Sequence, residues 1–182
     1  VGWHRGSDLT SKHRQAAAMN CLLSLLVTAS AVLGAEHDGH DGPCHAGCFV
    51  HKNGTMLAVK LTYDGNKFDI PGGQTNWQEP ATRTAQRETW EESGYEVTIG
   101  PLLATVRGGS FRIYECFLNE PAPKKNPDHE VSSVLWMNEA EIVNHVQEHT
   151  WRFEADQAHL YIEWLRNLVP NGQNHSRRLL LV

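Results

Sequence analysis

The chain has 182 residues, of which 40% are hydrophobic and 20% charged. This length accommodates one domain of ordinary size with an appendage, and the composition excludes disordered, collagenous and multi-span membrane proteins. The chain holds 16 basic and 21 acidic residues, a formal net charge of -5, so no broad basic face is available and we expect no nucleic acid as a partner.

Residues 1–35 have the pattern of an export signal. A basic flank precedes an uncharged stretch from 15 to 35 that ends in small residues, as in a secretory signal peptide. An uncleaved anchor helix is the alternative, because this stretch is just long enough to span a bilayer, and membrane contact is expected only in that case. If Met19 is the initiator, the basic flank is lost, the signal interpretation weakens and a cytoplasmic location becomes the alternative. We expect export to the periplasm or the medium.

Residues 36–45 form a linker rich in His, Asp and Gly, without periodicity. His37, His40 and His45, together with Cys44, are residue types that bind Cu²⁺ or Zn²⁺. The second half of a structural zinc site is missing at the usual spacing, so a polar linker is the preferred interpretation. An exported metal-binding protein that uses this segment remains an alternative function.

The expected domain covers 46–168 and begins with strands. Asn53 and Gly54 predict a tight hairpin turn between strands at 47–52 and 55–61. A helix is expected over 79–92, with Pro80 in its first turn and Gly94 at its end.

Further strands are expected at 96–106, 110–117 and 131–137. Asn138 and Glu141 resemble a capping box that opens a short helix, and 155–168 has the apolar periodicity of an amphipathic helix. This order predicts an α+β domain or an α/β/α sandwich, and the tail at 169–182 shows no pattern.

The expected first helix carries three carboxylates on one face. Glu88, Glu91 and Glu92 are spaced i, i+3 and i+4, so they repel one another unless solvent or a cation compensates. Oxygen ligands suit Mg²⁺ or Mn²⁺, and the Gly72-Gly73 pair lets the backbone approach closely, so that a carbonyl could add a further ligand.

The stretch 73–95 resembles the Nudix box, the signature of the Nudix hydrolases. The spacing G-x5-E-x7-R-E-x-x-E-E-x-G is met by Gly73, Glu79, Arg87, Glu88, Glu91, Glu92 and Gly94. Thr89 and Tyr95 stand where the family pattern has bulky aliphatic residues, and both departures affect packing. The resemblance covers about 46–168 and implies the Nudix fold, an α/β/α sandwich with a mixed sheet and a loop-helix-loop catalytic motif.

The resemblance also implies roles for individual residues. Glu88, Glu91 and Glu92 would bind the divalent metal with the Gly72 carbonyl, and Glu88 would also orient or deprotonate the attacking water. Arg87 and Glu79 would form a structural pair.

The same resemblance implies the reaction. Glu130 would be a further ligand or the base, since many members carry an acid a few residues before a strand tryptophan. The activity implied is metal-dependent cleavage of a pyrophosphate bond in a nucleoside diphosphate linked to another moiety. A catalytically silent, nucleotide-binding Nudix-like domain is the alternative.

Some side chains are candidates for substrate contact, since aromatic faces stack on nucleobases. They are Trp77, Phe111, Tyr114 and Arg152, the last of which stands between Trp151 and Phe153. For each, packing in the core or on the surface is the competing interpretation.

The cysteines leave the disulfide pattern open. Cys44 and Cys48 form a bond in an oxidising compartment if their geometry permits it, and Cys116 is a rival partner.

Overall fold

The computed structural model describes residues 45–168. The expected signal or anchor segment, the tail at 169–182 and all of the expected linker except His45 lie outside the described residues. Within 45–168, no helix has the length and apolar character needed to cross a membrane.

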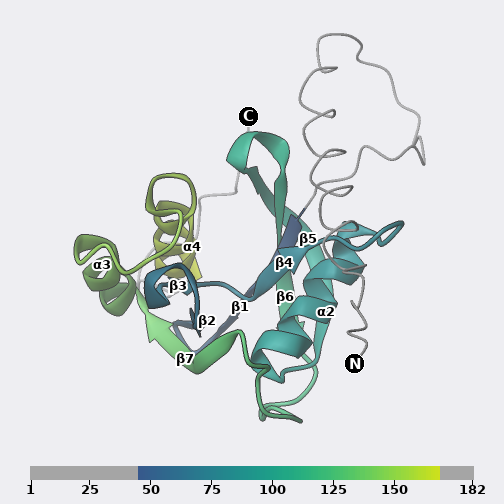
Figure 1. The fold of residues 1–182 in the computed structure, drawn as a ribbon. Coiled ribbons are helices and arrows are strands. Elements are labelled where there is room, and N and C mark those ends of the chain that lie inside the picture. The colour runs from purple at the N-terminus through teal and green to yellow at the C-terminus, as the bar shows by residue number, and fades with distance from the viewer. Residues whose placement is uncertain (1–44, 169–182) are drawn as a thin grey trace, which may run out of the picture.

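The described residues form one mixed sheet with helices on both faces (Figure 1). The strands are β1 (His45–Lys52), β2 (Thr55–Leu61), β3 (Phe68–Asp69), β4 (Gly72–Gln74), β5 (Val97–Val106), β6 (Phe111–Leu118) and β7 (Val131–Asn138). The helices are α2 (Ala81–Ser93), α3 (Glu139–Gln147) and α4 (His159–Leu168). The main path through the sheet is β3-β2-β1-β6-β5, with β4 paired to β1 and β7 to β2. Only the β1–β6 pair is parallel among these strands.

Alternation along β1 divides the core into two parts, because successive strand residues point to opposite faces. Ala46, Cys48 and Val50 belong to the apolar cluster beneath α2, together with Ala81 and Ala85 of that helix. The opposite face is the larger cluster, which packs on α3 and α4. It includes Phe49, Ile113, Ile142, Trp151, Tyr161 and Leu165. The expected α/β/α layering is confirmed.

Local signals in the sequence determined several element ends. Asn53 and Gly54 both have positive φ angles, as a primed hairpin turn requires. Gly94 ends α2 in the left-handed conformation and donates its N–H to the Trp90 carbonyl. Asn138 and Glu141 form both hydrogen bonds of the capping box at the start of α3.

The last helix begins later than its apolar pattern predicts. Regular α-helix starts at His159, and Glu154–Ala158 form a wider π turn before it. Phe153 has a φ of 51°, a left-handed conformation that prevents the helix from continuing toward the N-terminus. The expected start at residue 155 is therefore wrong by one turn.

Candidate active site

Helix α2 presents its carboxylates to strand β4 at different depths. Glu92 is only 4% exposed, and the side chain of Glu88 is 14% exposed. Glu91 lies one turn after Glu88 on the outer side of the helix, and its side chain is 40% exposed. Two of the three carboxylates are thus withdrawn from water, which is costly for a charged group that lacks a counter-charge.

Two glycines of β4 allow this close approach. The Gly72 N–H donates to Glu92 Oε2 at 2.8 Å. A Cβ built on Gly73 would lie 2.5 Å from Glu88 Cδ, and one on Gly72 would lie 2.7 Å from the Gly47 Cα. Gly73 therefore lets the backbone of β4 lie directly against the acidic face of α2, and Gly72 lets β4 lie close to β1.

Arg87 connects the loop before α2 to the carboxylates on it. Its Nε and Nη2 donate to the two oxygens of Glu79, each at 3.0 Å, so the expected pair is present. Its Nη1 lies 2.7 Å from Glu88 Oε1 and 2.8 Å from Glu91 Oε2. Nη2 also donates to the Gln74 carbonyl at 2.9 Å. One guanidinium group thus bonds three carboxylates and the backbone of the loop. Of these contacts, the sequence spacing indicated only the one with Glu79.

Burial controls the protonation of these acids. Burial raises the pKa of Glu88 to about 7, aided by the charges of Glu91 and Glu130 and opposed by Arg87. Burial also raises the pKa of Glu92 well above its ordinary value, although the Gly72 N–H opposes the shift. For Glu79, burial is outweighed by the hydrogen bonds from Arg87, and its pKa is lowered. The site therefore holds one carboxyl group, Glu88, with a pKa near neutral, beside Glu92 with a raised pKa and Glu79, which stays ionised.

Glu130 lies at the end of the loop that follows β6 and crosses the C-terminal end of α2. Asp128 N–H donates to the Glu91 carbonyl at 3.0 Å, and Glu130 N–H donates to Asp128 Oδ1 at 3.0 Å. The Glu130 carbonyl accepts from Thr62 N–H at 2.8 Å. Because its charge raises the pKa of Glu88, the Glu130 carboxylate lies within electrostatic reach of the acidic face of α2.

The donor set fits a hard divalent cation by its chemistry. It consists of carboxylate oxygens and a backbone carbonyl, which Mg²⁺ and Mn²⁺ prefer. Among residues 45–168, no three His, Cys, Asp or Glu side chains stand grouped as a metal site. Arg87 Nη1 instead bridges Glu88 and Glu91, so these side chains would have to turn from Arg87 to reach a shared cation.

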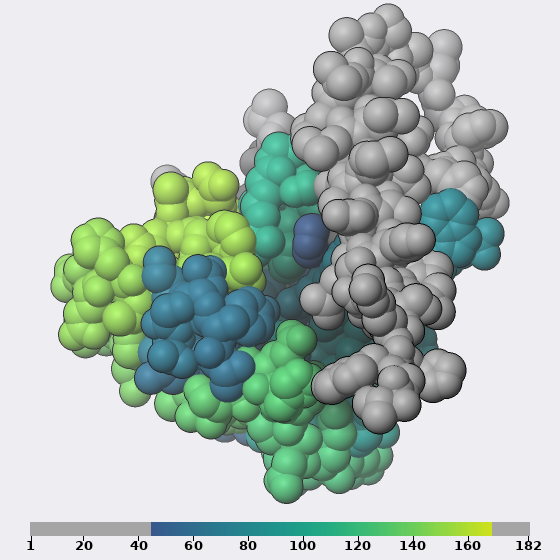
Figure 2. Space-filling view, viewed as in Figure 1, coloured from purple at the N-terminus to yellow at the C-terminus, as the bar shows by residue number. Residues whose placement is uncertain are grey.

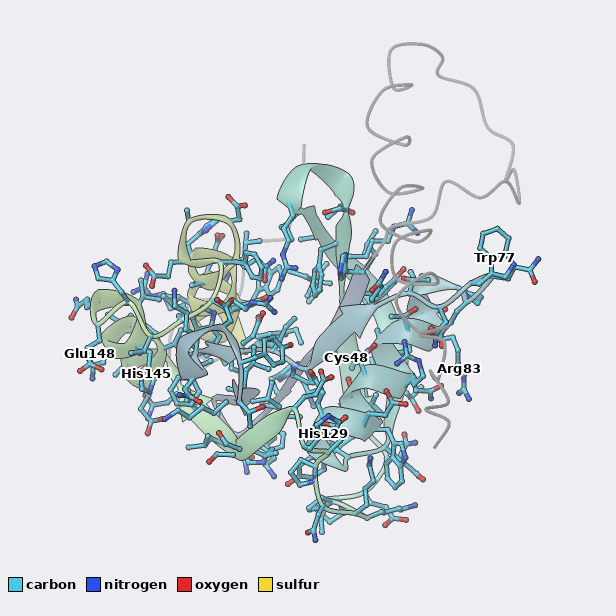
Figure 3. All side chains as sticks on the ribbon, viewed as in Figure 1. Cys48, Trp77, Arg83, His129, His145 and Glu148 are labelled. Carbon is cyan, nitrogen blue, oxygen red and sulfur yellow. A yellow bond between two sulfur atoms is a disulfide. The ribbon has the colours of Figure 1, made fainter. Side chains whose placement is uncertain are left out.

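The expected substrate contacts are not brought together. Trp77, at the tip of the loop before α2, is 69% exposed and points outward (Figure 3). Phe111 and Tyr114 are 3% and 7% exposed and belong to the two core clusters on opposite faces of the sheet. Their rings pack against protein and offer no face to a base, contrary to expectation, because both lie on the central strand β6.

Arg152 lies in a second polar cluster that the sequence did not indicate. Its Nε donates to Asp64 Oδ2 at 2.8 Å, and its Nη1 lies 3.9 Å from Asp69 Oδ2. Arg107 Nη2 lies 3.7 Å from the same oxygen of Asp69. Asp69 is 5% exposed. The sequence did contain a signal for this cluster, because Asp69 stands between the apolar residues Phe68 and Ile70. A charged residue in an apolar strand is buried only when it is paired.

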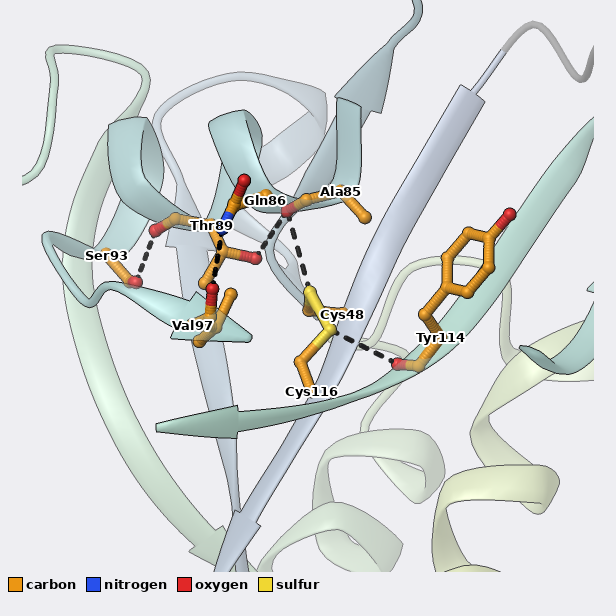
Figure 4. Close-up of a disulfide and its surroundings, with 8 residues drawn as sticks. All are labelled: Cys48, Ala85, Gln86, Thr89, Ser93, Val97, Tyr114 and Cys116. Atoms are coloured by element: carbon orange, nitrogen blue, oxygen red, sulfur yellow. Dashed lines mark hydrogen bonds between the residues drawn. A yellow bond between two sulfur atoms is a disulfide. The ribbon is translucent and has the colours of Figure 1, made fainter. Parts of the chain in front are cut away.

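A disulfide joins Cys48 of β1 to Cys116 of β6, with the Cα atoms 5.5 Å apart. The strands are parallel neighbours, with Cys48 opposite Tyr114 and Val50 opposite Cys116, so both sulfurs lie on the face that packs on α2. Figure 4 shows the bond beneath Ala85, whose carbonyl lies 3.6 Å from Cys48 Sγ. Of the two pairings left open, the one with Cys116 is present, and Cys44 lies outside the described residues.

Comparison with known proteins gives consistent matches. The family model of the NUDIX domain matches residues 44–161. A MutT-like protein from Streptomyces ambofaciens is 26% identical over 107 residues, 57% of this chain and 68% of that protein. A NUDIX hydrolase structure from Nitrosomonas europaea aligns with a TM-score of 0.56 and 14% identity, over 69% of this chain and 88% of that one. An ADP-ribose pyrophosphatase structure from Streptococcus suis aligns with a TM-score of 0.51 and 14% identity, over 67% and 90% of the two chains.

Proposed function

The chain belongs to the Nudix hydrolase family, and on this premise we propose that it uses a divalent cation to hydrolyse a pyrophosphate bond in a nucleoside diphosphate linked to another moiety. The observation that carries the proposal is the acidic face of α2 held against β4. Glu92 is buried there and bonded to the Gly72 N–H, Glu88 is mostly withdrawn from water, and Gly73 leaves room for the Glu88 carboxylate.

Glu88, Glu91, Glu92 and the Gly72 carbonyl would hold Mg²⁺ or Mn²⁺, with Glu130 as a further ligand or as the base. The bound cation supplies positive charge that neutralises the phosphate oxygens. Such charge is needed because the chain is acidic and its substrate is an anion.

Glu88 is the preferred residue to orient the attacking water and accept its proton. Its raised pKa, about 7, suits proton exchange near neutral pH. The water oxygen forms a bond to one phosphorus while the bridging P–O bond breaks, which gives two phosphate-containing products. Arg87 and Glu79 position the helix by fixing it to the preceding loop.

We also propose that the domain works outside the cytoplasm. The Cys48–Cys116 disulfide supports this, because such bonds persist mainly in oxidising compartments. Fractionation of cells that express the full chain, followed by N-terminal sequencing, tests it. Export predicts a mature protein that starts near residue 35, and an intact cytoplasmic protein with reduced cysteines would contradict it.

The activity is tested by incubating the purified chain with a panel of nucleoside diphosphate derivatives. We expect turnover in Mg²⁺ or Mn²⁺ and none in EDTA, with two phosphate-containing products from each substrate cleaved. Folded protein that binds a nucleotide but turns over no compound in either metal would favour the silent binding domain. Titration of Cu²⁺ or Zn²⁺ into the chain with and without residues 36–45 tests the metal-binding alternative, and identical isotherms would reject it.

A further inference from the structure

Two arginines and three aromatic rings alternate in a stack. The Arg152 guanidinium carbon lies 5.5 Å from the centre of the Tyr63 ring and 4.7 Å from that of Phe153. The Arg107 guanidinium carbon lies 3.4 Å from the Phe153 ring and 4.2 Å from the Phe111 ring. We call the five residues the arginine stack.

The stack borders a hollow in the surface. Figure 2 shows the surface recessed between segments 62–67 (blue), 107–110 (teal-green) and 150–156 (yellow-green), with the start of β1 (dark blue) at the bottom. These segments carry Tyr63, Arg107 and the Arg152–Phe153 pair. Arg107 and Phe153 both have left-handed backbone conformations, with φ of 54° and 51°, and strain of this kind concentrates at ligand sites.

The charges of the stack are balanced by two acids. Asp69 Oδ2 lies between the two guanidinium groups, 3.7 Å from Arg107 and 3.9 Å from Arg152. Asp64 pairs with Arg152 at 2.8 Å. Two cations thus face two carboxylates, so the hollow has no surplus positive charge that calls for a phosphate. An uncharged group fits it better.

Several polar atoms at the hollow still need partners. With its amide oxygen turned toward Arg107, Gln157 accepts from Nε at 2.6 Å and from Nη2 at 3.0 Å. Within residues 45–168, Arg107 Nη1 and Arg152 Nη2 then have no acceptor. The buried Nδ1 of His45 also has no partner there, and burial and both arginines lower the pKa of this imidazole. A ligand with hydrogen-bond acceptors would satisfy the arginines.

The hollow adjoins the carboxylates. A Cβ built on Gly72 would lie 3.2 Å from Cζ of Phe111 in the stack, and the Gly72 N–H is bonded to Glu92. Burial and the charge of Glu92 raise the pKa of Tyr63, so that ring is within electrostatic reach of the site. The stack thus lies next to β4, the strand that faces the carboxylates, so a single substrate can reach both.

We propose that the arginine stack binds the nucleobase of the substrate and selects guanine or uracil over adenine. The inference rests on the proposed function. A base is flat and uncharged, so its face suits the ring of Tyr63, which is 40% exposed. The remaining guanidinium donors, Arg107 Nη1 and Arg152 Nη2, can pair with carbonyl oxygens such as O6 of guanine. Adenine has no carbonyl oxygen, so it would leave these guanidinium donors without that acceptor.

Calorimetry in EDTA tests the inference without turnover. GMP, UMP, AMP and inorganic phosphate are titrated into the full chain, so the nucleotides differ only in their base. We expect GMP or UMP to bind at least tenfold more tightly than AMP. Equal affinities, no binding by any nucleotide, or phosphate binding as tight as GMP would overturn the inference, the last because it marks an anion site.

A variant localises the preference. Arg152→Lys keeps the charge facing Asp64 but loses the planar fork, and we expect it to reduce the preference over AMP at least tenfold with little change in Tm. Arg166→Lys, on exposed α4 and paired with Glu139, is the matched control. An unchanged preference in Arg152→Lys would overturn the inference. A selective chain without turnover would contradict only the proposed function, whereas an active enzyme that cleaves adenosine derivatives equally well would contradict only this inference.

Discussion

The carboxylate of Glu88 occupies the space that a side chain on Gly73 would need. A Cβ at position 73 would lie 2.5 Å from Glu88 Cδ and 2.6 Å from each of its oxygens. The glycine therefore fixes the depth at which α2 lies against β4, and with it the position of the group proposed to activate water.

Gly73→Ala should reduce kcat about 100-fold while the fold is retained, because even a displacement of about 1 Å of a catalytic group is costly. Steady-state kinetics and Tm measure the effect. Gly100→Ala is the control, since its Cβ would lie 2.6 Å from the ring of exposed Phe117, which can move, and 3.0 Å from the Glu115 carbonyl oxygen. Similar kcat values in the two variants would show that the position of Glu88 is unimportant.

Glu88→Gln and Glu92→Gln should each lower kcat about 100-fold or more, since both carboxylates are proposed to hold the cation and Glu88 to accept a proton. Each substitution keeps the size of the side chain, and the amide oxygen introduced by Glu92→Gln can still accept from the Gly72 N–H. Glu163→Gln, on the exposed side of α4, controls for a lost surface charge. Full activity in either site variant would mean that other carboxylates bind the cation or accept the proton.

Much of the fold was predictable because its signals are local. Asn53-Gly54, Gly94 and the Asn138/Glu141 box depend on backbone preferences within four residues, and the structure has all three as expected. The start of α4 was mispredicted because Phe153 is held in a left-handed conformation. Its ring lies against Arg107, which comes from a distant loop.

The site was predictable only in part for a similar reason. Helical spacing placed Glu88 and Glu92 on one face, but their burial depends on β4, which reaches α2 through a loop. The disulfide pairing depends on the parallel register of β1 and β6, which no local pattern encodes. Asp69 and Arg107 meet only in the folded chain.

The metal-free protein should lose stability as pH rises from 4.5 to about 7. Burial raises the folded-state pKa of Glu88 from 4.5 to about 7, so its contribution is fully present below 4.5 and lost as pH rises through 7. The loss should be on the order of 2–3 kcal/mol relative to Glu88→Gln, whose side chain does not titrate. Urea unfolding in EDTA across this range measures it, and parallel curves for the two proteins would contradict it.

Mg²⁺ added at pH 7.5 should restore stability to the wild type more than to Glu88→Gln, because a ligand that binds only the folded state stabilises it. Equal Tm shifts in the two proteins would mean that the cation binds elsewhere.

Arg87→Lys should lower kcat by roughly 10–100-fold, because an ammonium group cannot bond Glu79, Glu88, Glu91 and the Gln74 carbonyl together. Arg83→Lys, one turn earlier and bonded to Gln86, is the matched control. The measurement is the ratio of the kcat values of the two variants. A ratio near one would show that Arg87 does not position the catalytic carboxylates.

Loss of the disulfide should destabilise the domain by about 4 kcal/mol, from the loop-closure entropy of a crosslink spanning 68 residues. Denaturant unfolding of the Cys48→Ala/Cys116→Ala double variant measures the change, with reduced wild type as the comparison. An unfolding free energy equal to that of the oxidised wild type would show that the bond adds nothing to stability.

The same bond closes a covalent ring around the acidic helix, since Cys48 precedes the stretch 73–95 and Cys116 follows it. A single cut by a protease in the exposed loop around Trp77 would therefore leave two pieces still tied together at the centre of the sheet. In a protease-rich environment, such a nicked molecule would keep both halves of its site in one particle.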